Sequence, residues 1–204
     1  MTARDIRIGY APALAYRVTY IGELGWELYM PTEFATGVFE ALIAAGEEFD
    51  LKQVGLHAVD SLRLEKAYRH WGSDIGPDDT PLEAGLGFAV KLNKGEFIGR
   101  EALLRQKEKG LTRRLAVFNL EDPEPLIYHD EPIYRNGQLL SANTHGSYGH
   151  FCGATGMGYL ENPDGITNDW IANADYTINV EGKMVPAQVH LKPMYDPKSE
   201  RVRA

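Results

Sequence analysis

Two turn dipeptides constrain the fold of the C-terminal half of the chain most strongly. Asn136-Gly137 and Glu181-Gly182 each lie between short runs in which apolar and polar residues alternate. A two-residue hairpin turn of type I′ needs positive φ at both central positions, and it joins antiparallel neighbours. Further short strand-like runs, "RRLAVFNL" and "MGYL", occupy the same region. Residues 111–204 are therefore predicted to form a small all-β unit, either a barrel or a sandwich.

Residues 1–110 combine strand and helix patterns, which predicts an α+β domain with an antiparallel sheet and a domain boundary near Leu111. "LAYRVTY" (14–20) and "WELYM" (26–30) flank "GELG" and predict a hairpin, with Trp26 on the buried face. A helix is predicted to begin at Thr32 as N-cap and to end at Gly46. Further helices are predicted at 55–71 and 100–110, a loop at 72–81 and a short strand at 87–92.

Charge and hydropathy exclude several classes of function. The net charge of −8 argues against general nucleic-acid binding, although it leaves room for a local basic site for a small anion. No apolar run is long enough to cross a membrane, and residues 1–20 lack the apolar centre of a signal peptide. The single cysteine, Cys152, excludes an internal disulfide and a cysteine-based zinc site. These features favour a cytoplasmic protein, or a mitochondrial matrix protein in a eukaryote.

The remaining reactive residues point to structure rather than chemistry. Cys152 has no basic neighbour in sequence and is interpreted as a small buried residue. His145 and His150 lie in "HGSYGH", which predicts a glycine-rich loop rather than a metal pair. The glycines that follow do not open a helix after a strand, so neither a flavin nor a nicotinamide nucleotide is expected in this chain. Composition and spacing alone leave the function unassigned.

Longer stretches resemble a known family. "YIGELGWELY", "GLHAVDSLRLEKAYRHWGSDI", "TPLEAGLGFAVKLNKGEFIGREAL" and "EPIYRNGQLLSANTHGSYGH" resemble, in order, segments of the glycine cleavage T-protein (aminomethyltransferase) family. The variants "GELGWELY", "EKAYRHWG" and "PMYDP" are most similar to the folate-binding portion of dimethylglycine and sarcosine dehydrogenases. The resemblance covers nearly the whole chain. It implies tetrahydrofolate as the acceptor of a one-carbon unit from an amine, with a flavin-containing domain or subunit as a possible partner.

The resemblance also implies a set of folate-binding residues. Glu27 matches the glutamate expected to recognise the pterin, since a carboxylate can accept a ring N–H and an exocyclic amino group together. Tyr20 and Arg63 fall at positions around the same ligand, although Arg63 is equally able to pair with Asp60 one helical turn earlier. Trp71 is expected either to border the folate or to cap its helix from the core. Phe88 and Tyr195 are further candidates for the wall of the site, whereas Glu23 is expected to be structural.

Two departures from the family pattern qualify these expectations. Val59 stands where the family has arginine before "DSLR", so a contact to the anionic folate tail is lost or is supplied by Lys192, Lys198 or Arg201. No residue of this chain matches the family's catalytic aspartate, which the resemblance places upstream of the first residue. We therefore expect the C-terminal part of a larger polypeptide, catalytically silent alone and able to self-associate through an uncovered apolar face. The alternatives are a non-catalytic module that docks to a flavoprotein, and a family member that uses folate as a sensor.

Overall fold

A computed structural model describes residues 2–204 of the chain. The chain divides into two compact units, each described by itself below. Unit 1 comprises Met1–Leu62 and Lys198–Ala204, and unit 2 comprises Arg63–Pro197. The predicted α+β class is confirmed: an antiparallel sheet with helices is present in addition to a closed β-barrel.

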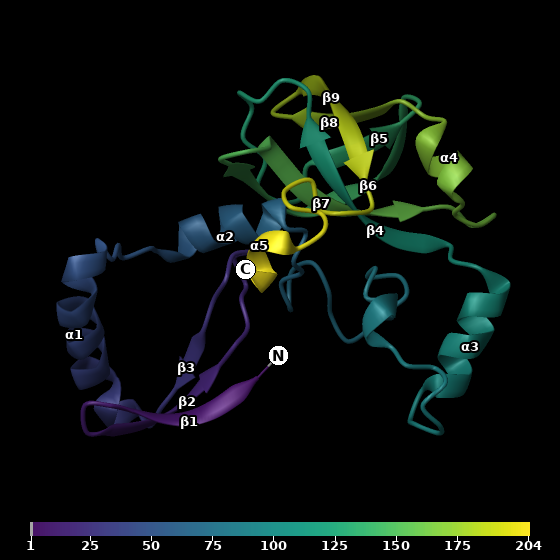
Figure 1. Cartoon of the computed structure of the whole chain (residues 1–204). Coiled ribbons are helices and arrows are strands. Elements are labelled where there is room, and N and C mark those ends of the chain that lie inside the picture. Colours follow the sequence, from purple (N-terminus) through teal and green to yellow (C-terminus); the bar gives the residue numbers. More distant parts are fainter. Residues whose placement is uncertain (1) are drawn as a thin grey trace. The chain divides into compact units, whose positions relative to one another are not determined.

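Unit 1 contains a three-stranded antiparallel sheet in the order β1 (Ala3–Ile8), β2 (Ala11–Tyr16) and β3 (Glu27–Tyr29), drawn in purple in Figure 1. The remaining elements are helical, and they are η1 (Thr32–Phe34), α1 (Ala35–Gly46), η2 (Glu47–Phe49), the first part of α2 (Leu56–Glu65) and α5 (Glu200–Arg203). In β2 the alanines at 11, 13 and 15 are buried and the side chains between them are not. This period of two is the signature of a sheet with one covered face.

The sequence-based boundaries in unit 1 need three corrections. The strand predicted at 14–20 ends at Tyr16, so β2 and β3 are joined by a longer loop. Thr32 lies inside η1, and the N-cap residue of α1 is Phe34, without a side-chain cap. Gly46 belongs to α1, and Asp50, with φ 55°, ends the helical segment. Trp26 is 51% exposed rather than buried, with the Arg17 guanidinium 5.7 Å from its ring centroid.

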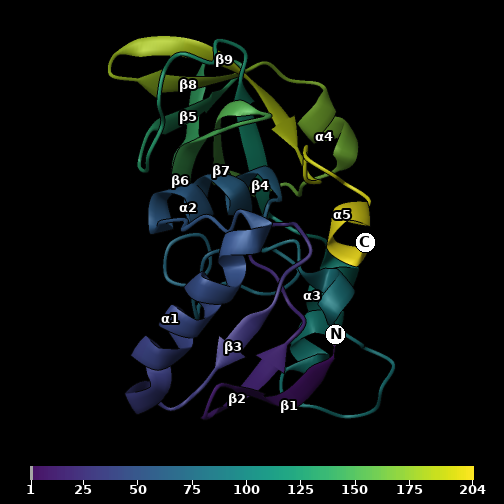
Figure 2. The same ribbon diagram turned by 60° about the vertical axis from the view of Figure 1, so that its left-hand side comes forward.

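Unit 2 is built on a closed antiparallel barrel in which each strand bonds two neighbours, in the order β4-β7-β6-β5-β8-β9 and back to β4. Its strands are β4 (Arg113–Leu120), β5 (Pro132–Arg135), β6 (Gln138–Gly149), β7 (Gly153–Glu161), β8 (Tyr176–Val180) and β9 (Lys183–His190). α4 (Asn168–Ala172) lies between β7 and β8 in sequence, and Figure 2 shows the same barrel from a second direction. Both predicted hairpins are confirmed, since Asn136, Gly137, Glu181 and Gly182 all have positive φ.

Two apolar clusters hold unit 2 together. The first includes Phe118, Ile133, Leu160 and Ile178, none of which is exposed. The second joins Leu64, at the end of α2, to side chains of β4 and β7. Residues of β4 therefore contribute to both clusters, which explains why four consecutive positions of this strand, 115–118, are buried.

The predicted end of α2 and the strand predicted at 87–92 are both wrong. α2 ends at Glu65 rather than near Trp71, because Ala67 adopts a left-handed φ of 53°. Residues 87–92 form no strand but begin with η3 (Gly87–Ala89).

α3 (Arg100–Lys109) is as predicted, with Gly110 at its C-cap.

The segment 145–149 is part of β6 rather than a loop. Its last glycine, Gly149, is required by close approach and not by positive φ, since a Cβ there would lie 2.4 Å from Glu65 Oε1.

Candidate functional site

Glu27, the predicted pterin-binding residue, opens the short strand β3 opposite Tyr16 of β2. Its side chain is half-buried, and Oε2 accepts a hydrogen bond from the hydroxyl of Tyr29, two residues along the same strand face. This hydrogen bond raises the pKa of Tyr29 above its usual value. Among residues 2–204 the carboxylate of Glu27 has no cationic partner and accepts no other hydrogen bond. The fold therefore leaves most of its acceptor capacity unused.

Tyr20, the second candidate in unit 1, lies in the loop between β2 and β3 and is half-buried. The other four candidates, Arg63, Trp71, Phe88 and Tyr195, belong to unit 2. The predicted site residues are thus divided between the two units.

Arg63 is fully buried at the end of α2, and its guanidinium donates hydrogen bonds to neighbouring groups of the protein. Its Nη1 donates to the Asp74 carboxylate and, over 3.1 Å, to the Tyr68 carbonyl oxygen. Asp74 is also fully buried and accepts from the His70 N–H at 2.8 Å and from the Thr144 hydroxyl at 2.7 Å. This solvent-free pair ties the end of α2 to the segment after it and to β6. These contacts favour a structural role for Arg63.

Trp71 and Phe88 are both exposed apolar side chains. Trp71 is 66% exposed, while its backbone forms an isolated parallel bridge with Ile75. Phe88 is 77% exposed within η3. The interpretation of Trp71 as a core residue is therefore wrong. Exposed aromatic rings are available to border a ligand, which is the role that the resemblance implies for both residues.

Tyr195 belongs to a cluster that sequence reasoning missed. Its ring stacks on that of Phe151, with centroids 4.5 Å apart and planes inclined by 9°. Two buried charged residues at the end of α2 hold this pair. Lys66 Nζ donates to Asp196 Oδ2 at 3.0 Å, and Glu65 Oε1 accepts the N–H groups of Phe151 and Cys152 at 2.6 and 2.9 Å.

The sequence contains these charged residues in a pattern that does not distinguish buried from solvated side chains. Residues 65–66 continue a helical pattern, and helical Glu and Lys side chains are usually solvated. Only the tertiary structure shows that both are 1% exposed.

Cys152 lies beside Glu65, and this position makes its thiol unreactive. Burial, together with the Glu65 carboxylate, raises the pKa of the thiol to about 11. We expect alkylation of the folded chain by iodoacetamide at pH 8 to be about a hundredfold slower than that of the urea-unfolded chain, measured by mass spectrometry. Because the folded state holds this proton more tightly, the associated stability is present below about pH 9 and is lost as the pH rises toward 11. Equal rates for the folded and unfolded chains would contradict this placement.

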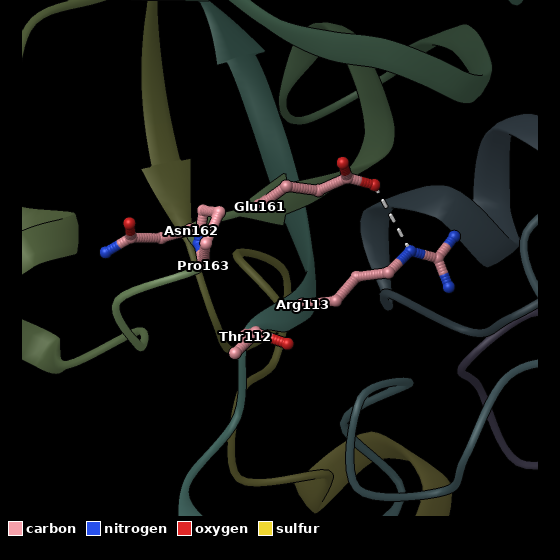
Figure 3. Close-up of a pocket in the computed structure, with 5 residues that line it drawn as sticks. All are labelled: Thr112, Arg113, Glu161, Asn162 and Pro163. Carbon is pink, nitrogen blue, oxygen red and sulfur yellow. Dashed lines mark hydrogen bonds and ion pairs between the residues drawn. The ribbon is translucent and has the colours of Figure 1, made fainter.

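A shallow cavity of about 450 Å³ opens where β4 begins and β7 ends (Figure 3). Its lining residues are Thr112, Arg113, Glu161, Asn162 and Pro163. Arg113 Nε donates to Glu161 at 3.4 Å, its Nη1 donates to Asp79, and its guanidinium lies 3.4 Å from the centroid of the Tyr159 ring. The charge in this cavity is therefore neutralised by the protein itself, and none of the predicted folate residues lines it.

Residues 2–204 offer neither a cluster of metal ligands nor a membrane-spanning helix. No group of three or more histidine, cysteine, aspartate or glutamate side chains is arranged to hold a metal ion. None of the described helices is both long and apolar enough to cross a membrane.

Comparison with known proteins identifies relatives along the length of the chain. Residues 1–94 match the GCVT N-terminal domain, and residues 113–196 match the glycine cleavage T-protein C-terminal barrel domain. The 4-methylaminobutanoate oxidase (formaldehyde-forming) of Paenarthrobacter nicotinovorans is 44% identical over 98% of this chain and 23% of its own length. The mitochondrial sarcosine dehydrogenase of Homo sapiens is 42% identical over 93% of this chain and 21% of its own length.

A solved structure is also similar to this chain. The aminomethyltransferase T of the glycine cleavage system from Bartonella henselae superposes with a TM-score of 0.77 at 29% identity, covering 91% of this chain and 50% of that one. The chain thus spans less than a quarter of the two curated relatives and half of the structural neighbour.

Proposed function

This chain belongs to the glycine cleavage T-protein family, and on that premise we propose that it contributes a tetrahydrofolate-binding site to a protein that transfers a one-carbon unit from an amine to tetrahydrofolate. The observation that carries the proposal is the unused carboxylate of Glu27. It stands at the family's motif position and is half-buried, and within the described part of the chain it has one hydrogen bond and no cationic partner. A carboxylate in this state is suited to accept two N–H groups from a pterin, because the protein does not already occupy it.

The other site residues have different roles under this proposal. Tyr20, in the same unit as Glu27, is proposed to border the pterin. The exposed rings of Trp71 and Phe88 and the stacked ring of Tyr195, all in unit 2, stay proposed ligand contacts because the resemblance implies them and because each offers flat apolar surface. Arg63 acts indirectly, because its guanidinium is buried against Asp74 and holds the segment that carries Trp71. None of these residues is proposed as catalytic.

The names of the relatives suggest the wider context. An oxidase and a dehydrogenase of N-methylated amines share this module at over 40% identity. We therefore propose a flavin-containing domain or subunit as the partner that oxidises the amine and generates the one-carbon unit. We also propose a location in the cytoplasm or in the mitochondrial matrix; the sarcosine dehydrogenase relative is mitochondrial by its name.

Fluorescence titration with tetrahydrofolate tests the proposal. We expect saturable quenching of tryptophan emission at one site, and a 3- to 10-fold weaker affinity in Trp71→Leu, because an aromatic contact contributes about 0.5–1.5 kcal/mol. Tyr128→Leu is the matched control, since Tyr128 is a 61% exposed ring in unit 2 that the proposal does not use. Absence of saturable binding by the unmodified chain would contradict the proposed function.

A further inference from the structure

Two arginine side chains in unit 2 lie together without a carboxylate partner. Arg69 follows α2, and Arg114 is the second residue of β4; both are partly buried. Arg69 donates Nε to the Ala84 carbonyl at 2.9 Å and Nη1 to the Ala67 carbonyl, while Arg114 donates Nη1 to the Leu82 carbonyl at 3.0 Å. Among residues 2–204 neither forms an ion pair. Arg113, the next residue along β4, is by contrast paired with Asp79 and Glu161.

The carboxylates nearest to this arginine pair are already engaged. Asp74, whose charge acts on Arg69, is bound by Arg63, His70 and Thr144. Glu83, in the loop between the two arginines in sequence, accepts the N–H and the hydroxyl of Thr80 at 3.0 and 2.7 Å. Neither carboxylate is therefore paired with these arginines, and the favourable effect of the Asp74 charge on Arg69 is smaller than the opposing effects of burial and of Arg114.

The free donors of the two guanidiniums converge beside Gly85. A Cβ at this glycine would lie 2.6 Å from Arg69 Nη2 and 3.6 Å from Arg114 Nη2. Gly85 has a φ of 73°, a conformation that favours glycine in its own right. Among residues 2–204, neither Nη2 has a protein acceptor, and Arg114 Nε is buried without one. The two Nη2 groups, one from each guanidinium, therefore remain unused and lie close to the same point beside Gly85.

Electrostatics favours an anion between these side chains. Burial lowers the pKa of both guanidiniums, and the charge of Arg114 lowers that of Arg69 further. Two like charges in a partly desolvated setting repel each other, and each unmet buried donor adds a desolvation cost. A bound anion would relieve both effects. The planar fork of a guanidinium matches two oxygens of one ligand, which makes arginine the preferred residue for carboxylate and phosphate.

We propose that Arg69 and Arg114, opposed across Gly85, form a binding site for a small oxyanion whose carboxylate or phosphate oxygens bridge the two Nη2 groups. This site does not depend on the proposed folate function, since it contains none of the residues assigned to the pterin or to the rings around it. It also differs from the cavity at Arg113, where that arginine is paired with Glu161 (Figure 3) and with Asp79.

Anion titration at constant ionic strength tests the proposal, with inorganic phosphate and malonate as separate probes exchanged for chloride. The chain should show a saturable rise in melting temperature, and the ¹⁵Nε–¹Hε resonances of Arg69 and Arg114 should shift with the same midpoint. Arg114→Gln should weaken the affinity for the tighter-binding anion by about tenfold, because the charged N–H donors of one guanidinium are lost. Arg114→Lys should retain an intermediate affinity. Arg105→Gln is the control, because Arg105 is an exposed helical arginine with no partner among residues 2–204.

The two probes also identify the ligand class. A stronger response to malonate assigns a carboxylate ligand, and a stronger response to phosphate assigns a phosphate ligand. Resonances that do not shift in the unmodified chain would overturn the proposal without reliance on any variant. A midpoint unchanged in both Arg69→Gln and Arg114→Gln, with circular dichroism showing that they remain folded, would overturn it as well.

Discussion

Replacement of Asp74 by asparagine is expected to lower the free energy of unfolding by about 3–5 kcal/mol, the range found when one member of a buried ion pair is removed. Neither side chain of the Arg63–Asp74 pair is exposed. Asparagine has nearly the same shape but no charge, so the guanidinium of Arg63 would remain buried without its counter-ion. The new amide group would also face the His70 N–H or the Thr144 hydroxyl, both of which now donate to this carboxylate.

Denaturant unfolding followed by circular dichroism measures this effect. Asp78→Asn is the matched control, because Asp78 lies in the same loop, is exposed and has no partner among residues 2–204. It should change stability by no more than about 0.5 kcal/mol. A loss below about 1 kcal/mol in Asp74→Asn would show that Arg63 is not held by this pair, and it would return Arg63 to the list of direct ligand contacts.

The all-β character of the C-terminal region was predictable from sequence because its signals are local, whereas the choice between a barrel and a sandwich was not. Turn chemistry at Asn136-Gly137 and at Glu181-Gly182 and the period of two in β8 fix hairpins without reference to the rest of the chain. The same holds for α3, whose helical composition ends at Gly110. The boundary near Leu111 and the binding roles of the site residues remain predictions.

The errors arose where tertiary contacts override local propensity. The pattern of α2 continues to Trp71, yet the helix stops at Glu65, and the next two residues are buried rather than solvated. Glycines around Gly149 look like loop residues in sequence, whereas the strand needs them because Glu65 approaches the backbone. The stacked pair of Phe151 and Tyr195 depends on two loops that are distant in sequence, so no local pattern could have placed it.

Replacement of Glu27 by glutamine is expected to weaken tetrahydrofolate binding by about 10- to 100-fold. Glutamine retains the size of the side chain, but its amide offers one acceptor oxygen in place of two and carries no charge. Loss of a charge-assisted hydrogen bond typically removes 1.5–3 kcal/mol of binding free energy. Stability should hardly change, because Glu27 has only the hydroxyl of Tyr29 as a hydrogen-bond donor among residues 2–204.

Tyr29→Phe provides the matched control for this variant. The change removes the one donor to the Glu27 carboxylate that residues 2–204 supply, and it leaves the carboxylate itself intact. Under the proposed function its affinity for tetrahydrofolate should be equal to or slightly tighter than that of the unmodified chain, because the ligand no longer competes with the hydroxyl. A loss as large as that of Glu27→Gln would place the pair, rather than the carboxylate, at the centre of the site.

Calorimetric titration of tetrahydrofolate into the unmodified chain, Glu27→Gln and Tyr29→Phe is the most direct test of the central claim. The account predicts one site per chain, a loss of 10- to 100-fold in Glu27→Gln and no loss in Tyr29→Phe, with all three proteins equally stable to denaturant. Unchanged affinity in a folded Glu27→Gln would contradict the claim that this carboxylate recognises the pterin.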